Sequence, residues 1–307
     1  MSICIYTYRQ QSFLMRTQNL NTAYPEIERL ILKKRRKAYT TSDLQNIFHS
    51  NRDEWRLSTR TTYTKFLNYL VEKKQFLKTK KLIHIESGSE KLIYTLENAN
   101  KYDIITTIKK SGYLSYLTAL VVHELTLQIP KTLYISEEIH DTYLNDNILN
   151  QESIDRVFSK EQRTTTNIYK DEISNERYVL IEKKMNIKNI GIITDSSFDY
   201  PTSDLERTLI DCVVRPQYSG GIFSVLEAFS NASDILNLEK LDSYLDDLNY
   251  TYPYHQLVGF YLDKSGYNES KLKPFLSKVS NFNFYMTYNL SNKKLDTKWK
   301  IYYPEGI

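Results

Sequence analysis

The sequence predicts an α+β protein in which an N-terminal winged helix-turn-helix domain precedes a larger mixed α/β domain. Three short amphipathic helix patterns followed by two β-prone runs indicate the first domain. From about residue 101, helix and strand patterns interleave, which indicates the second. The net charge also changes sign between the two parts. We therefore expect a flexible arm over residues 1–22, the winged helix-turn-helix over 23–97 and the α/β domain over 98–307.

Composition excludes several classes of protein. With 8 Gly in 307 residues, neither GxGxxG nor GxxxxGK[ST] occurs, so the common dinucleotide and P-loop sites are not expected. Two cysteines, Cys4 and Cys212, exclude a disulfide framework or a cysteine zinc site, and the five histidines include no HExxH. We expect no cofactor and no metal. No signal peptide and no run of about 18 apolar residues is found, so a soluble cytoplasmic protein without a membrane partner is expected.

The charge is unevenly distributed along the chain. Residues 1–97 hold 18 Lys and Arg against 9 Asp and Glu, a net charge of +9. Residues 98–307 hold 23 against 28, a net charge of −5, and the whole chain carries +4. A polyanion is therefore attracted to the N-terminal third only, although solvated basic helices would give the same count.

The first domain begins with a helix after Pro25, because proline is favoured in the first helical turn. Ile27, Leu30 and Ile31 give it an apolar stripe. Five consecutive basic residues, 33–37, lie near the C-terminal end of this predicted helix.

Two further helices and a hairpin follow. The second helix is predicted to be capped at Thr41 or Ser42, and the third is predicted to start at Ser58 or Thr59. The apolar stripe of the third helix consists of Tyr63, Phe66, Leu67, Leu70 and Val71. Residues 76–85 and 91–96 are β-prone, and residues 86–90 form the turn of a hairpin between them.

In a winged helix-turn-helix the third helix enters the DNA major groove and the hairpin reaches the flanking backbone. Basic and small hydroxyl side chains on the outer face of the third helix suit phosphate and base-edge contacts. A winged helix that contacts only protein remains an alternative. The predicted DNA-binding residues are Arg56, Ser58, Thr59, Arg60, Thr61, Thr62, Thr64, Lys65 and Asn68, with Lys78, Lys80 and Lys81 on the hairpin.

The second domain alternates helix and strand patterns and is long enough for its own core. Helices are predicted over residues 103–110, 115–126, 152–159, 203–214, 221–229, 238–248, 255–262 and 269–279. Strands are predicted over residues 133–136, 164–169, 178–182, 187–193, 283–288 and 299–303.

Two segments of this domain carry more specific patterns. In the first, a helix led by Ser115 contains Ala119, Leu120, His123 and Leu125, and a Pro-Lys turn into a strand follows it. In the second, a helix leads directly into a Pro- and Gly-containing turn. Its pattern residues are Glu206, Arg207, Thr208, Asp211, Arg215, Pro216, Gly220 and Gly221.

Together these segments resemble the AbiEi family, the antitoxins and transcriptional regulators of type IV abortive-infection toxin–antitoxin systems. The first resembles the family pattern SAL..HGL with residues 116–118 inserted, and the second resembles ERT..D followed by RP...GG. The resemblance covers most of residues 24–265. It implies a non-enzymatic antitoxin that binds inverted repeats of double-stranded promoter DNA as two self-associating copies. It also implies a functional partner, an AbiEii-like nucleotidyltransferase toxin.

The residues of the second segment also have an ordinary structural interpretation. Ser203 and Glu206 have the spacing of a capping box, and Asp211 and Arg215 that of an i, i+4 ion pair. Pro216 would end the helix. His123 on an apolar helix is more often a hydrogen-bonded core residue than a base. These features favour a scaffold over a catalytic site.

A restriction-type nuclease, targeted by the winged helix, is the alternative function. Glu182-Lys183-Lys184 ends a predicted strand and has the E-x-K form of such enzymes. Asp171 or Asp195 would then be the second metal-binding carboxylate. The upstream Pro-Asp of these nucleases is absent, and no GxSxG motif supports serine hydrolase chemistry.

Overall fold

The computed structural model describes residues 18–34, 36–140, 149–194 and 198–307. The chain is mixed α/β, as predicted, and divides into two compact units. The first unit comprises residues 1–80 and 92–103, and the second comprises 81–91 and 104–307. Most of the predicted arm, residues 1–17 with Cys4, lies outside the described residues. The hairpin segment 81–91 belongs to the second unit, although its sequence predicted a place in the first domain.

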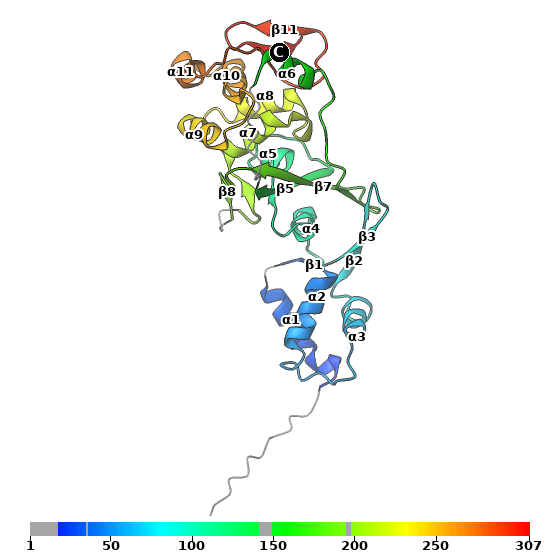
Figure 1. The fold of residues 1–307 in the computed structure, drawn as a ribbon. Helices are drawn as coiled ribbons and strands as arrows, with labels where there is room; N and C mark the ends of the chain where they lie inside the picture. The colour runs from blue at the N-terminus through cyan, green and yellow to red at the C-terminus, as the bar shows by residue number, and fades with distance from the viewer. Residues whose placement is uncertain (1–17, 35, 141–148, 195–197) are drawn as a thin grey trace, which may run out of the picture. The chain divides into compact units, whose positions relative to one another are not determined.

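Helix α1 (Leu20–Lys33) opens the first unit (Figure 1), so residues 20–22 are helical and not part of an arm. The side chain of Asn19 accepts a hydrogen bond from the Thr22 amide at 3.0 Å and caps the helix. The prediction that the helix starts at Pro25 is therefore wrong, because an earlier cap was available and Pro25 lies within the helix. Ile27 and Ile31 are fully buried, as the stripe predicts.

The remaining elements of the first unit are short. They are β1 (Ala38–Thr40), α2 (Thr41–Asn51), α3 (Tyr63–Asn68) with a π-helical turn at Tyr69–Lys73, the start of β2 (Lys78–His84) and most of β3 (Glu90–Thr95). Strand β1 pairs antiparallel with β3, from Ala38 opposite Thr95 to Thr40 opposite Ile93. The three helices bury a shared core that includes Leu44, Phe48, Trp55 and Phe66.

A sheet with the strand order β2-β6-β7-β5-β4-β9-β8 is the centre of the second unit. The later strands are β4 (Tyr113–Leu114), β5 (Thr132–His140), β6 (Ile168–Asp171), β7 (Arg177–Met185), β8 (Ile192–Ile193) and β9 (Thr202–Ser203). Strands β5 and β7 run parallel over nine residue pairs, from Thr132 opposite Arg177 to His140 opposite Met185. This long pair aligns the charged residues at the ends of both strands.

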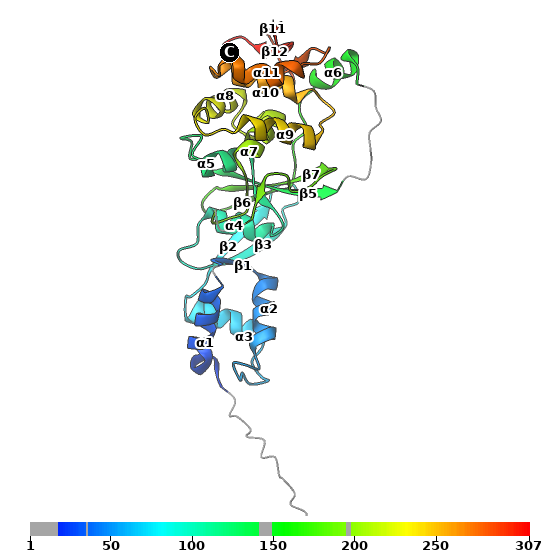
Figure 2. The same ribbon diagram turned by 90° about the vertical axis from the view of Figure 1, so that its left-hand side faces the viewer.

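Helices lie in layers on one side of β5 and β7 (Figures 1 and 2), with α5 and α7 beside the strands. The second unit also receives the end of α4 (Lys101–Ile108), whose first residues belong to the first unit. The helices are α5 (Tyr116–Val122), α6 (Gln151–Phe158), α7 (Leu205–Val214), α8 (Ile222–Asn231), α9 (Leu238–Leu248), α10 (Tyr254–Lys264) and α11 (Glu269–Ser277). Residues 206–213 of α7 are all buried, so this helix is the centre of the helical layer.

The C-terminal residues complete the core of this unit. Strands β10 (Phe284–Tyr285), β12 (Ile301–Pro304) and β11 (Lys293–Asp296) form a small sheet in that order. Trp299 is fully buried against Gly259 of α10, where an added Cβ would lie 2.1 Å from the indole ring. Glycine at this position therefore allows the indole to pack directly on the helix backbone.

Several predicted elements differ from the observed ones. The predicted strand 187–193 is reduced to Ile192–Ile193, and the predicted helix 115–126 ends at Val122. Strands β4 and β9 were not predicted, because two-residue strands have no detectable period. No helix within the described ranges has both the length and the apolar character needed to cross a membrane.

Candidate nucleic-acid interface and candidate binding pocket

Helix α3 begins later than predicted. The Thr62 hydroxyl accepts a hydrogen bond from the Lys65 amide at 3.3 Å and caps the helix. The preceding residues form a turn in which the Thr61 amide donates to the Ser58 carbonyl at 2.8 Å. Thr59 and Arg60 therefore lie before the helix, because the Thr62 cap competes successfully with the earlier hydroxyl residues.

The apolar stripe of the third helix faces the core. Phe66 and Leu70 are fully buried, while Tyr63, Leu67 and Val71 are partly buried against the same cluster. The predicted DNA-binding residues around the helix are exposed, except for the half-buried Ser58 and Thr61. The exposed ones are Arg56, Thr59, Arg60, Thr62, Thr64, Lys65 and Asn68.

A hollow of about 480 Å³ lies beside the N-terminal ends of α1 and α3. Its charged lining residues are Arg60, Lys65 and Lys73, and none of its described lining residues is acidic. The Lys65 ammonium donates to the Arg60 carbonyl at 3.3 Å, which holds the two residues together. The amide groups at the start of α1 add a partial positive charge to this region. The hollow is therefore suited to an anion such as a phosphate.

The hairpin lysines do not occupy the hairpin tip. Lys78 pairs with Glu97 at 2.6 Å and Lys81 with Glu90 at 2.5 Å, while Lys80 is half-buried. Beyond Lys80, strand β2 pairs with β6, with Leu82 opposite Asp171. The three lysines were predicted to lie on the wing; the outer part of this hairpin, from Lys81 on, belongs to the second unit, where β2 is a strand of its sheet.

The second cluster of candidate residues surrounds Arg207, whose side chain is fully buried in α7. Its guanidinium donates to Glu138 of β5, to Asp211 at 3.1 Å and to the Ile190 carbonyl at 2.7 Å. Lys183 of β7 donates to the other oxygen of Asp211 at 2.5 Å. Two cations and two carboxylates thus compensate one another in the interior.

This environment shifts the pKa values of the cluster. Burial lowers the pKa of Lys183 to about 8, against the opposing attraction of Asp211. Burial raises the pKa of Asp211, but Arg207 and Lys183 outweigh it and the pKa is lowered. The predicted ion pair between Asp211 and Arg215 is wrong, because Asp211 faces the sheet and is taken by Arg207 and Lys183.

The other residues of the two family patterns have structural partners. The Ser115 and Ser136 hydroxyls lie 2.8 Å apart, and a ring nitrogen of His123 lies 2.7 Å from the Ser203 carbonyl. Glu206 pairs with Lys240 at 2.8 Å. The hydroxyl of Thr208 lies 2.7 Å from that of Ser203.

The start of α7 differs from the prediction, whereas its end at Val214, before Pro216, is as predicted. Asp204 caps the helix by accepting from the Arg207 amide at 2.9 Å, so the predicted cap at Ser203 is wrong. Pro216 starts a single 3-10 turn. Gly220 and Gly221 then have φ values of 82° and 92°, a region in which glycine carries no Cβ penalty.

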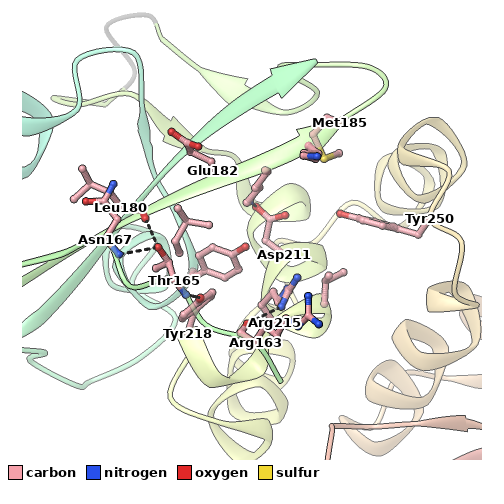
Figure 3. A pocket seen from close by; sticks show the side chains of 15 residues that line it. Arg163, Thr165, Asn167, Leu180, Glu182, Met185, Asp211, Arg215, Tyr218 and Tyr250 are labelled. Carbon is pink, nitrogen blue, oxygen red and sulfur yellow. Dashed lines mark hydrogen bonds and ion pairs between the residues drawn. The ribbon is translucent and has the colours of Figure 1, made fainter. Parts of the chain in front are cut away.

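A pocket of about 570 Å³ lies between the outer edge of β7 and the C-terminal half of α7 (Figure 3). Strand β6 covers the edge of β7 only to Leu180, whose amide donates to the Asn167 carbonyl at 3.0 Å. Residues 181–185 have no partner on this side among the described residues. The pocket therefore exposes an unpaired strand edge. Its aromatic and charged lining residues are Tyr116, Tyr218, Tyr250, Arg163, Arg215, Glu182, Lys183, Lys184 and Asp211.

The two described carboxylates of the nuclease alternative, Asp171 and Glu182, do not lie close together. Asp171 adjoins Glu176 at the β6–β7 turn, where its carboxylate accepts from the Ile173 amide at 2.9 Å. Glu182 lies six residues further along β7, which is roughly 20 Å in an extended strand. Asp195 lies outside the described residues. Asp171 and Glu182 are thus too far apart to bind one metal ion.

One group of described residues has the spacing of metal ligands, namely Asp242, Asp246 and His255. Both carboxylates form ion pairs with Lys278 at 2.8 Å, so the ammonium group of this lysine already neutralises part of their charge.

The fold and the two sites define a mixed α/β protein with a basic helical unit and a pocketed α/β unit. The chain is similar to the crystal structure of the RV2827C protein from Mycobacterium tuberculosis. The TM-score is 0.55 at 12% identity, over 94% of this chain and 92% of that chain, so the likeness concerns the fold. No protein-family model and no curated protein matches the sequence.

Sequence reasoning did not identify Glu138 and Tyr250 as site residues. Glu138 stands beside Glu137 in a strand whose second half is polar, so no local signal shows which of the two carboxylates is buried. No local signal marks Tyr250, which reaches the pocket from the turn after α9.

Proposed function

We propose that the protein is a DNA-binding transcriptional repressor and the antitoxin of a type IV toxin–antitoxin system. The first unit would act as a winged helix and bind duplex DNA through α3 and the turn before it. The observation that carries this proposal is the basic hollow formed by Arg60, Lys65 and Lys73, whose described lining has no carboxylate. Phosphate contacts of this kind position a protein on a duplex.

The order of elements in the first unit supports the same function. Three helices precede a strand pair, and a short strand between the first two helices joins the sheet. This order is typical of winged helices. Because residues 81–91 lie in the second unit, we propose that contacts to the flanking backbone come from the start of α1 rather than from the hairpin tip, which contains Glu86 and Glu90.

The antitoxin assignment rests on the resemblance of the two segments in the second unit to the AbiEi family. The proposal includes two copies on inverted promoter repeats and an AbiEii-like nucleotidyltransferase toxin as the functional partner. It places the protein in the cytoplasm and assigns it no catalytic activity.

The test is a fluorescence anisotropy titration of the full chain on duplex DNA from its own promoter at several salt concentrations. Each neutralised phosphate adds about −0.9 to the slope of log K against log salt concentration. A triple variant Arg60→Gln, Lys65→Gln, Lys73→Gln is expected to bind weakly and with a shallower slope. Lys273→Gln, an exposed lysine of α11, is the matched control. Salt-independent binding, or an unaffected triple variant, would reject DNA binding at this face.

A further inference from the structure

The pocket beside β7 has no role in the proposed DNA binding, yet it has the size of a ligand site. Its volume of about 570 Å³ falls within the range of small-molecule pockets, roughly 300–1,000 Å³. It lies wholly in the second unit.

One end of the pocket offers two guanidinium groups. Arg163 is exposed and Arg215 is half-buried, and Figure 3 places them next to each other. Arg215 donates to the Arg163 carbonyl at 3.1 Å, so the two residues are tied together. Among the described residues, neither arginine has a carboxylate within ion-pair distance. Guanidinium groups without a counter-ion suit a phosphate, because each of them can donate two parallel hydrogen bonds to phosphate oxygens.

Three tyrosines and four apolar residues line the pocket beside its polar and charged residues. The rings of Tyr116 and Tyr218 meet edge to face with their centres 5.2 Å apart. The Tyr218 hydroxyl accepts from the Thr165 amide at 2.7 Å, which fixes its ring. Tyr250 faces the pocket from the opposite side, and its hydroxyl points toward Asp211 (Figure 3). Fixed aromatic walls suit a flat ring.

The remaining wall can recognise the edge of such a ring. The uncovered edge of β7 from Ile181 to Met185 presents backbone N–H and C=O groups, and Asn167 lies at the start of this edge. Alternating donors and acceptors of this kind match the donors and acceptors of a nucleobase. Asp211 and Lys183, which also line the pocket, form an ion pair with each other at 2.5 Å.

We propose that this pocket binds a nucleotide, with the phosphate on Arg163 and Arg215 and the base between the tyrosine walls and the β7 edge. The site is independent of the DNA-binding face of the first unit. The ligand chemistry, a base joined to a phosphate, has two sources: a free mononucleotide or the 5′-phosphorylated end of a single strand.

Isothermal titration calorimetry of the full chain tests this inference with AMP, GMP, adenosine, inorganic phosphate and a 5′-phosphorylated tetranucleotide. We expect at least one mononucleotide to bind, and adenosine and phosphate alone to bind at least tenfold more weakly. Arg163→Gln and Arg215→Gln should each weaken binding roughly tenfold or more, because each removes a charge-assisted hydrogen bond. Arg177→Gln, an exposed arginine of β7 outside the pocket, should leave it unchanged.

The same titrations distinguish the two sources of the ligand and show whether a loss of binding comes from misfolding. Binding of the tetranucleotide alone, with the same dependence on Arg163, would identify a strand end as the source; binding of a mononucleotide would identify the free ligand. Arg163 is exposed, so its variant keeps the test valid if Arg215→Gln disturbs the end of α7. The inference is overturned if none of these ligands binds at millimolar concentration, or if folded Arg163→Gln binds like the parent.

Discussion

Asp211 is the residue on which the buried charge cluster of the second unit depends. Its carboxylate receives hydrogen bonds from both Arg207 and Lys183, and its side chain is 2% exposed. Replacing it by Asn would leave Arg207 with the carboxylate of Glu138 and would leave Lys183 without a carboxylate within ion-pair distance among the described residues. Breaking a buried pair in this way costs about 3–5 kcal/mol of unfolding free energy.

Urea unfolding followed by circular dichroism measures the effect of Asp211→Asn. Asp246→Asn is the control, because this carboxylate also pairs with a lysine but is 56% exposed. Exposed pairs contribute about 0–1 kcal/mol. Equal losses for the two variants would contradict the view that burial makes the Asp211 cluster critical.

The lowered pKa of Lys183 predicts that the free energy of unfolding rises with pH. Its pKa is about 8 in the folded chain, against 10.5 when unperturbed, because burial disfavours the ammonium. Between these values the unfolded chain binds a proton that the folded chain has released, so the unfolding free energy increases with pH. Below pH 8 both states are protonated and the contribution is constant.

The measurement compares the parent chain with Lys183→Met by urea unfolding at pH 7.5 and 9.5. We expect the parent to gain on the order of 1–2 kcal/mol relative to the variant across this interval. Both chains share every other titrating group, so their difference isolates Lys183. Parallel pH profiles would show that this lysine does not titrate in the interval.

Arg60 distinguishes base reading from phosphate contact on the proposed DNA-binding face. Arg60→Ala should cost about 1–3 kcal/mol at one base position if the side chain reads a base, and should relax specificity there. An equal loss on every sequence, with a reduced salt slope, would make it a phosphate contact. Anisotropy titrations on single-base variants of the promoter decide, and unchanged affinity would remove Arg60 from the interface.

At the scale of elements, strand β2 connects the sequence of the first unit to the sheet of the second. Leu82, Ile83 and His84 pair with β6, and Leu82 is fully buried. A fragment of residues 98–307 lacks this strand and exposes the edge of β6. Unpaired edges lose ladder hydrogen bonds and invite aggregation.

We therefore expect a fragment of residues 81–307 to unfold at a higher urea concentration than a fragment of residues 98–307. Circular dichroism gives the two midpoints, and size-exclusion chromatography reports aggregation of the shorter piece. Matching midpoints for two monomeric fragments would mean that β2 contributes nothing to the sheet.

Helix α3 illustrates how a local cap decides the position of an element. Its apolar phase was predictable, since Phe66 and Leu70 are buried as the 3.6-residue period requires. Its start was not, because Ser58, Thr59 and Thr62 are all acceptable caps and only the packed structure selects Thr62.

At the scale of the whole molecule, the division into two compact units leads us to expect that the proposed repression and the proposed toxin neutralisation are separable. The fragment of residues 81–307 retains both AbiEi-like segments but lacks α1, α2 and α3. We expect it to rescue growth when co-expressed with the cognate toxin, without repressing a promoter reporter. If the folded fragment gives no rescue, neutralisation requires the first unit, and repression becomes the more direct route to it.

The sequence by itself determined the helices with a clear period, the sign change of the charge and the mixed α/β class. Helix α9 has the predicted bounds, Leu238–Leu248, because amphipathic period and capping act within a few residues of each other. Only the tertiary structure decided which charges pair and which unit the hairpin joins. The carboxylate of Asp211 forms an ion pair with Lys183, 28 positions away, and not with Arg215, four positions away. Such contacts depend on strand register and helix packing, which no local pattern encodes.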